Sequence, residues 1–288
     1  MLIGWAFISI SVYVSLSLGV TAFLMLPPMY ACFLSFSSPR WVSLGAALLS
    51  GLTLTLFMDP LHALLYTLAG GVFGIVAYSL SHVMERVELL VVLMGSYLSM
   101  LYMLYIIAAR ELLGVDLHAG VKTALVEMFG KELTSMGINI TELFRQIAAL
   151  SFGGIFMIGG VLALWSLYMG ARLAASRGTP VRVPNFLAFR LRELTLLPIA
   201  ALYAVLYLLS VSVGGDFWQM ASVLTFILLF LFFLQGISFI AWWRAKRGKN
   251  NRLFYLLAFL LFLIPMGQIG MGLLGFIENM TQMRKIGG

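Results

Sequence analysis

Residues 217–252, FWQMASVLTFILLFLFFLQGISFIAWWRAKRGKNNR, decide the fold. The run from Leu224 to Leu234 holds ten apolar residues, which together favour membrane insertion by about 3–6 kcal/mol. A Trp pair follows at 242–243, as is typical of the headgroup level, and five basic residues come directly after it. The stretch therefore predicts a membrane-spanning helix over 218–243 whose C-terminal end faces the cytoplasm. A helix of that length measures about 39 Å and should tilt or kink in a hydrocarbon core of about 30 Å.

The composition of the whole chain extends this interpretation to a polytopic membrane protein. Apolar residues make up 62% of the 288 residues and charged residues only 10%, whereas a soluble domain carries about 25%. The net charge of +7 is concentrated in two short loops, 172–193 and 244–252, which the positive-inside rule places in the cytoplasm. We therefore expect no nucleic-acid partner. The single cysteine, Cys32, excludes an intrachain disulfide and gives no basis for a cysteine-based metal site.

Hydrophobic stretches along the chain predict an all-α transmembrane bundle of about eight spans, forming one domain over 1–288. Most approach the roughly 20 residues that a membrane helix needs. The spans are expected near 2–26, 41–58, 61–80, 89–109, 147–171, 194–213, 218–243 and 253–276. The apolar piece 29–36 is too short to cross and is either re-entrant or interfacial, and the side of the N-terminus depends on that choice.

Local signals mark several boundaries between these segments. Asp59-Pro60 is typical of an N-cap followed by proline at the first helical position. Asn139 with Glu142 resembles a capping box that starts the next helix. Segment 110–146 carries mixed charges with apolar residues at helical spacing, which predicts an amphipathic helix outside the bilayer. Pro265 should kink the last span.

Small residues recur at helical spacing in three predicted spans. Such residues allow the backbones of membrane helices to approach closely. Two explanations remain open, ordinary packing within this chain and docking onto another membrane subunit. The residues concerned are Ala47, Gly51, Gly70, Gly74, Ala77, Gly153 and Gly160.

The sequence contains no recognisable catalytic or cofactor-binding set. None of the eleven acidic residues lies in the middle of a predicted span, which argues against a proton- or sodium-coupled carrier. There is no HExxH motif and no pair of membrane-depth aspartates. The three histidines, at 62, 82 and 118, lie in loops or near helix ends. We expect no enzymatic activity, no metal and no cofactor.

Two polar features do lie at membrane depth. Gln235-Gly236 interrupts the apolar run of the seventh predicted span, and Gln268 lies in the glycine-rich part of the eighth. One interpretation is a glutamine hydrogen bond between adjacent helices, worth about 0.6 kcal/mol on average. The other is a small polar cavity that binds a ligand between the two helices, with Gln235, Gly236 and Gln268 as its lining.

The order of features resembles the YybS-like family of uncharacterised bacterial multispan membrane proteins. The resemblance rests on MLPPMYACFLSFSSPRWVSLGAALLSG (25–51), PNFLAFRLRELTLLP (184–198), LQGISFIAWW (234–243) and GFIENMTQMRK (275–285). The family's ending often has an acidic residue, an aromatic and an arginine; this chain has Glu278 and Arg284 without the aromatic.

That family is itself similar to the substrate-capture (S) components of energy-coupling-factor transporters, which bind a small molecule in the bilayer beside an ATPase-driven partner. The resemblance implies a small-molecule-binding or transport-related subunit of the bacterial cytoplasmic (inner) membrane. Its implied partners are the lipid bilayer, a small-molecule ligand and another membrane subunit. The chain departs from S components in having more predicted spans and no recognisable vitamin site. The alternative is a structural or scaffolding membrane protein that acts through partner subunits.

Overall fold

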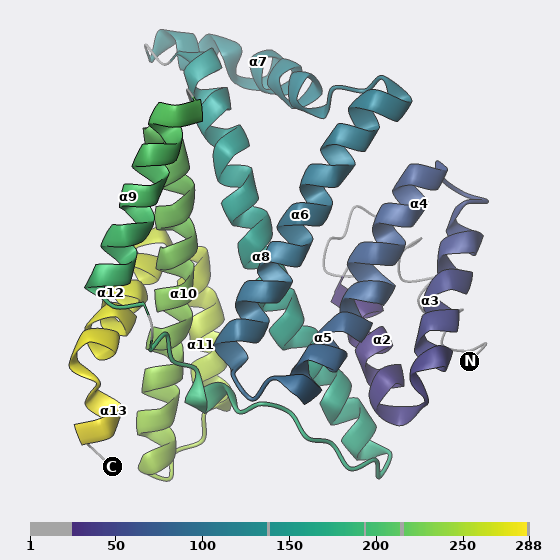
Figure 1. Cartoon of the computed structure of the whole chain (residues 1–288), viewed down its shortest axis with the longest axis vertical. Helices are drawn as coiled ribbons and strands as arrows, with labels where there is room; N and C mark the ends of the chain where they lie inside the picture. The colour runs from purple at the N-terminus through teal and green to yellow at the C-terminus, as the bar shows by residue number, and fades with distance from the viewer. Residues whose placement is uncertain (1–24, 137–138, 193, 214–215, 287–288) are drawn as a thin grey trace. The chain divides into compact units, whose positions relative to one another are not determined.

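The computed structural model describes residues 25–136, 139–192, 194–213 and 216–286, and these residues form helices and loops without any strand (Figure 1). The predicted all-helical class is therefore confirmed. Two compact units share the chain. The N-unit comprises Met1–Glu85, Leu89–Phe144 and Gly154–Pro184, and the C-unit comprises Arg86–Glu88, Arg145–Gly153 and Asn185–Gly288.

The N-unit is built mainly from the first helices of the chain. In order these are α2 (Leu26–Ser37), α3 (Arg40–Leu54), α4 (Pro60–Tyr66), the π-helical η2 (Thr67–Val72), α5 (Phe73–Val83), α6 (Val87–Leu113), α7 (Leu117–Ser135) and α8 (Ile140–Ser176). The Asp59 cap is confirmed, because its Oδ1 accepts a hydrogen bond of 2.8 Å from the Leu61 amide. The short apolar piece 29–36 lies within α2, whose first turn holds both prolines.

The predicted span 147–171 lies within a longer helix, α8. The amphipathic segment 110–146 contains only one separate helix, α7, because α8 begins at Ile140, seven residues before the predicted start. The predicted Asn139 cap is confirmed, because its Oδ1 accepts from the Glu142 amide at 3.3 Å and α8 begins at the next residue. At its other end α8 continues to Ser176, so the predicted loop 172–193 begins later than expected.

Close packing between small residues holds α2 against the helix formed by α4, η2 and α5. A Cβ added at Gly70 would contact the Pro27 ring, and one at Gly74 would overlap the carbonyl of Pro28. The Tyr97 hydroxyl, from α6, donates a 3.1 Å hydrogen bond to the carbonyl of Leu68 in η2. The Leu68 carbonyl also accepts from the Phe73 amide, five residues further on, as in a π-helix.

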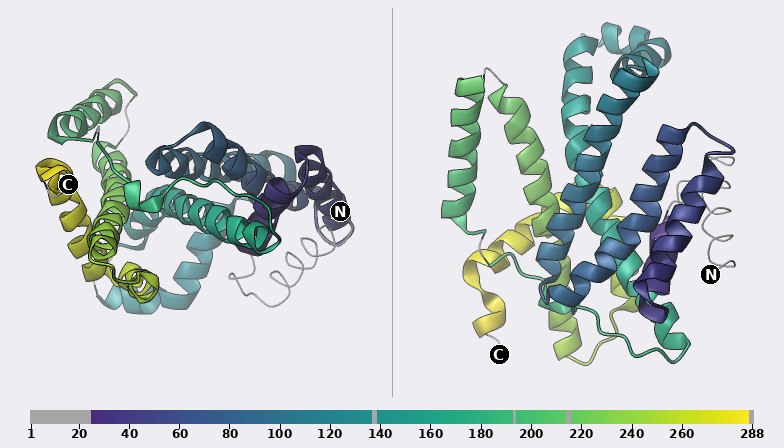
Figure 2. Two further views of the ribbon diagram at one scale, coloured as in Figure 1. Left: turned by 90° about the horizontal axis from the view of Figure 1, so that it is seen from below. Right: turned by 45° about the vertical axis from the view of Figure 1, so that its right-hand side comes forward.

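The C-unit contains the remaining helices. These are the 3-10 turn η3 (Phe186–Ala188), α9 (Leu196–Val213), α10 (Phe217–Lys246), α11 (Arg252–Leu263), α12 (Pro265–Thr281) and α13 (Met283–Ile286). Helices α9 and α10 lie side by side in both views of Figure 2. Asp216 caps α10 by accepting from the amides of Trp218 and Gln219 at 3.0 and 3.3 Å.

The predicted last span, 253–276, is a broken helix and not a kinked one. Ile264 has extended backbone angles, and Pro265 is the first residue of α12. A proline disfavours helical angles in the residue before it, so α11 ends there, and the axes of the two helices differ by 113°. This arrangement is either one broken span or a re-entrant loop.

Four helices in the described part of the chain are long and apolar enough to cross a membrane, and the bent pair would make a fifth. The four are Pro60–Val83, Val87–Leu113, Glu142–Ser176 and Phe217–Lys246. The predicted spans at 41–58 and 194–213 correspond to shorter apolar helices, α3 and α9. The predicted span 2–26 lies almost wholly outside the described residues, so the count of eight stays a prediction.

Candidate functional site

The candidate site begins at the contact between α10 and α12. A Cβ added at Gly236 would overlap the carbonyl oxygen of Met271, and one added at Gly275 would overlap that of Phe232. The two backbones therefore touch directly through their glycines. This contact brings the polar residue Gln235, which precedes the α10 glycine, against the last turn of α12.

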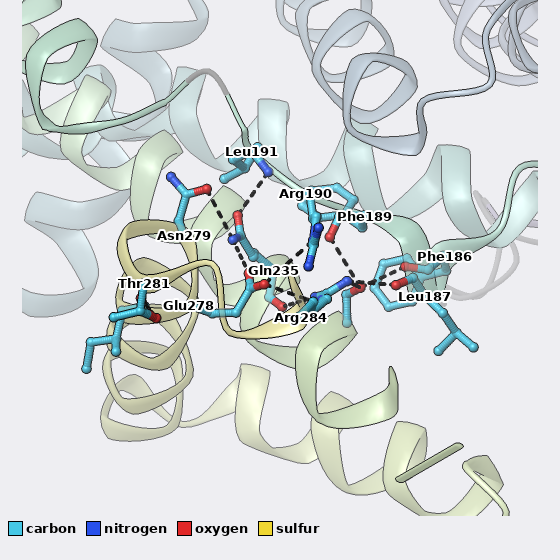
Figure 3. Close-up of polar contacts among 12 residues, drawn as sticks. Phe186, Leu187, Phe189, Arg190, Leu191, Gln235, Glu278, Asn279, Thr281 and Arg284 are labelled. Atoms are coloured by element: carbon cyan, nitrogen blue, oxygen red, sulfur yellow. Dashed lines mark hydrogen bonds and ion pairs between the residues drawn. The ribbon is translucent and has the colours of Figure 1, made fainter. Parts of the chain in front are cut away.

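Gln235 is buried, with 1% of its surface exposed, and both the nitrogen and the oxygen of its amide are hydrogen-bonded (Figure 3). Its Nε2 donates to Glu278 Oε2 and, at 3.3 Å, to Asn279 Oδ1. Its Oε1 accepts from the Leu191 amide at 3.0 Å. One side chain thus links α10 to the end of α12 and to the loop before α9.

Arg284, at the start of α13, points back into the same cluster. Its Nε lies 3.2 Å from Glu278 Oε1, and its Nη1 donates to the Leu187 carbonyl at 2.7 Å and to Ser238 Oγ at 3.2 Å. Only 4% of this side chain is exposed. Burial lowers the pKa of Arg284 to about 10, with the nearby Arg190 charge acting in the same direction and Glu278 opposing it. The guanidinium therefore still carries its charge at neutral pH.

A second guanidinium group, from Arg190, approaches the same carboxylate. Its Nε lies 3.7 Å from Glu278 Oε1, and 16% of its side chain is exposed against 1% for Glu278. Its Nη2 is buried and has no hydrogen-bond partner among the described residues. Two arginines thus share one buried glutamate, and the three side chains together carry one excess positive charge.

The loop that carries Arg190 is fixed to the helices on both sides of that residue. Ser238 Oγ, on α10, donates to the Phe186 carbonyl at 2.8 Å. Asn279 Nδ2, on α12, donates to the Leu194 carbonyl at 2.7 Å. Phe189 is fully buried, at 0% exposed. The position of Arg190 is therefore set by the protein itself.

The three residues expected to line a ligand cavity have separate partners. Gln235 belongs to the charged cluster formed with Glu278, Arg284 and Arg190. Gly236 is covered by the backbone of α12. Gln268 Nε2 donates to the Phe262 carbonyl at 2.5 Å, where α11 ends. Within the described residues no hydrogen bond joins the two glutamines, and each instead bonds a backbone group.

The small residues expected at packing or docking faces contact helices of this chain. The Gly70–Gly74 face lies under α2, and a Cβ at Gly51 would meet the Thr67 side chain on η2. Ala47 and Ala77 are buried. In the C-unit a Cβ at Gly153 would meet the Phe226 ring. Gly160 of α8, in the N-unit, is buried.

Sequence reasoning from the residues missed most of the charged cluster. Its missed members are Arg190, Ser238, Glu278, Asn279 and Arg284. Arg190 was interpreted only as part of a basic loop that faces the cytoplasm. Glu278 lay outside the predicted spans. One signal was available: the resemblance itself ends on an acidic residue and an arginine, at 278 and 284.

Several helices that are long and apolar enough to cross a bilayer define the chain as a helical membrane protein. A family described as "Predicted membrane protein (DUF2232)" matches residues 3–278, nearly the whole chain, and the chain belongs to that family. No curated protein and no solved structure gives a significant match. The described residues contain no group of three or more His, Cys, Asp and Glu side chains able to hold a metal ion.

Proposed function

We propose that this chain is a small-molecule-binding or transport-related subunit of the bacterial cytoplasmic membrane, similar in role to an S component and without catalytic activity of its own. The observation that carries the proposal is the buried Arg190 Nη2, which the described residues leave without a hydrogen-bond partner. Buried donors in proteins almost always have an acceptor. In a binding subunit, a polar group of the bound ligand would supply that acceptor.

Stability alone does not account for the cluster. Burying an ion pair costs desolvation that its attraction often fails to recover, so buried pairs are weak evidence for a stabilising role. A single glutamine–backbone bond would be enough to join α10 to the loop. Here the chain adds three charged residues, Glu278, Arg284 and Arg190, in a loop and at helix ends, and these extra charges support a binding role.

The proposed site therefore lies at Arg190 and not between Gln235, Gly236 and Gln268. Gln235 serves as a positioning residue, because its Oε1 holds the Leu191 amide next to that arginine. Eight spans, with loops 172–193 and 244–252 in the cytoplasm, would place Arg190 at the cytoplasmic side. In that orientation an ATPase-driven partner of the energy-coupling-factor type would have access to the loop. We also propose, as part of the same function, that the chain is a member of the YybS-like family.

The test is a ligand screen on the purified full chain in a non-ionic detergent. Vitamins and common metabolites would be added in three groups, anionic, neutral and cationic, and the thermal midpoint measured for each. We expect at least one compound to raise the midpoint in a saturable way, with native mass spectrometry giving a one-to-one complex. Absence of saturable binding across all three groups would contradict the proposed function.

The alternative, a scaffolding protein that docks through small-residue faces, has less support. The Gly70–Gly74 face contacts Pro27 and Pro28 of the chain's own α2, so it is already occupied. Pull-down from native membranes with the wild type and the Gly70→Leu variant distinguishes the two ideas. Loss of a specific partner from a variant that remains folded would favour the scaffold.

A further inference from the structure

We infer that the ligand of this site is an oxyanion, a carboxylate or phosphate group bound by the guanidinium of Arg190; the inference rests on the proposed function. It follows from the charge balance of the cluster, the Arg190 donor that lacks an acceptor, and the greater exposure of the Arg190 side chain compared with its charged neighbours.

The charge balance favours an anion over a neutral or cationic group. Arg190 and Arg284 face one carboxylate, Glu278, whose Oε2 is occupied by Gln235. Its Oε1 is shared, at 3.2 Å from Arg284 and 3.7 Å from Arg190. Arg190 is thus the less closely paired of the two arginines. An incoming anion would neutralise the cluster, whereas a cation would add to its excess charge.

The free donor also favours an oxyanion by its geometry. A guanidinium is a planar fork of N–H donors that matches two oxygens of a carboxylate or phosphate. The Arg190 Nε lies 3.7 Å from Glu278 Oε1, and its Nη2 is buried without an acceptor among the described residues, as is Nε of Arg284. An oxygen of a ligand at Nη2 would give that donor the acceptor it lacks.

Access and rigidity distinguish Arg190 from the other charged members of the cluster. Its side chain is 16% exposed, against 4% for Arg284 and 1% for Glu278. The backbone of the next residue, Leu191, is fixed by Gln235. The Nη2 atom itself is buried, so a ligand would have to displace the atoms that cover it, but the fixed backbone lowers the ordering cost of binding.

Two sources could provide this chemistry, the headgroup of an anionic phospholipid or a soluble anion. The experiment uses the full chain in a non-ionic detergent at constant ionic strength, with the thermal midpoint as readout. One arm adds sodium phosphate or sodium acetate against sodium chloride. The other adds phosphatidylglycerol against phosphatidylcholine in mixed micelles. We expect saturable stabilisation in one arm, and the arm that responds identifies the source.

Two variants assign the effect to the site. Arg190→Gln should weaken the stabilising anion about tenfold or more, as expected for loss of a charge-assisted hydrogen bond. Arg192→Gln removes the same charge two residues away, at an exposed position, and should leave the affinity unchanged. If Arg190→Gln does not fold, Arg190→Lys keeps the charge but loses the fork and should still bind more weakly than the wild type.

Three outcomes would overturn the inference. The first is a wild-type protein that responds to neither oxyanions nor anionic lipid. The second is equal weakening in the Arg190→Gln and Arg192→Gln variants, which would indicate general surface charge. The third is saturable binding of a neutral ligand, unaffected by Arg190→Gln, which would refute the oxyanion and leave the proposed function standing.

Discussion

Replacing Glu278 by glutamine is the sharpest test of the buried cluster. The change keeps the size of the side chain and removes the one carboxylate that Arg190 and Arg284 share. Both guanidinium groups would then remain buried without an acidic partner among the described residues. We therefore expect a large loss of stability from a nearly isosteric substitution.

The magnitude follows from the two contact distances. At 3.2 and 3.7 Å, Coulomb's law with an effective dielectric constant of about 20 gives about 4–5 kcal/mol of attraction for each contact. Desolvation and the repulsion between the two arginines offset part of this. Removing one partner of a buried pair typically costs about 3–5 kcal/mol, and we expect Glu278→Gln to fall in that range.

The assay is thermal unfolding of the purified protein in detergent, followed by circular dichroism. A loss of about 3–5 kcal/mol should lower the midpoint by several degrees. Glu85→Gln is the matched control, because Glu85 Oε1 lies 3.5 Å from Arg182 Nη2 while both side chains are 91% exposed. Exposed ion pairs contribute little to stability, so the thermal midpoint of the control should equal that of the wild type. A Glu278→Gln midpoint equal to that of the control would refute the reasoning.

Three further substitutions test the packing and capping described above by the same unfolding measurement. Gly236→Ala should cost about 1–3 kcal/mol through overpacking, because its Cβ would overlap the Met271 carbonyl, whereas Gly270→Ala, with no atom near its Cβ, should be nearly neutral. A larger loss of stability in Gly270→Ala than in Gly236→Ala would contradict the close contact of α10 with α12. Asp216→Ala should cost about 1 kcal/mol by removing the cap of α10, and an unchanged midpoint would argue against that cap. Tyr97→Phe should cost about 1 kcal/mol through the lost bond to η2, and no loss would indicate that water replaces the hydroxyl.

The parts of the fold that the sequence predicts are those set by local signals. Helix α10 begins one residue before the predicted span 218–243 and ends three after it, because a long apolar run and an aspartate cap lie within the segment itself. The Asp59 and Asn139 caps were identified for the same reason. The break at Ile264 was only half predicted. Proline indicates a disturbance at that position, but whether a helix kinks or breaks depends on what else packs there.

The charged cluster was missed because its members are far apart in sequence. Arg284 bonds a carbonyl 97 residues earlier in the chain, and Gln235 contacts Glu278 across 43 residues. Hydropathy places Glu278 and Arg284 outside the apolar run and therefore suggests solvent. In the structure the close contact of α10 with α12 buries both. A pattern within one segment carries no information about the segment that covers it.

The choice of glutamine at position 235 can be explained from the partners that surround it. The site needs one acceptor, for the Leu191 amide, and two donors, for Glu278 and Asn279. A neutral primary amide supplies both functions at once, and only one orientation works, since the reverse would set its oxygen against the carboxylate. Glutamate would add a second negative charge beside Glu278, and lysine could not accept. The residue that interrupts the apolar run of α10 is therefore the one that holds the Arg190 loop in place.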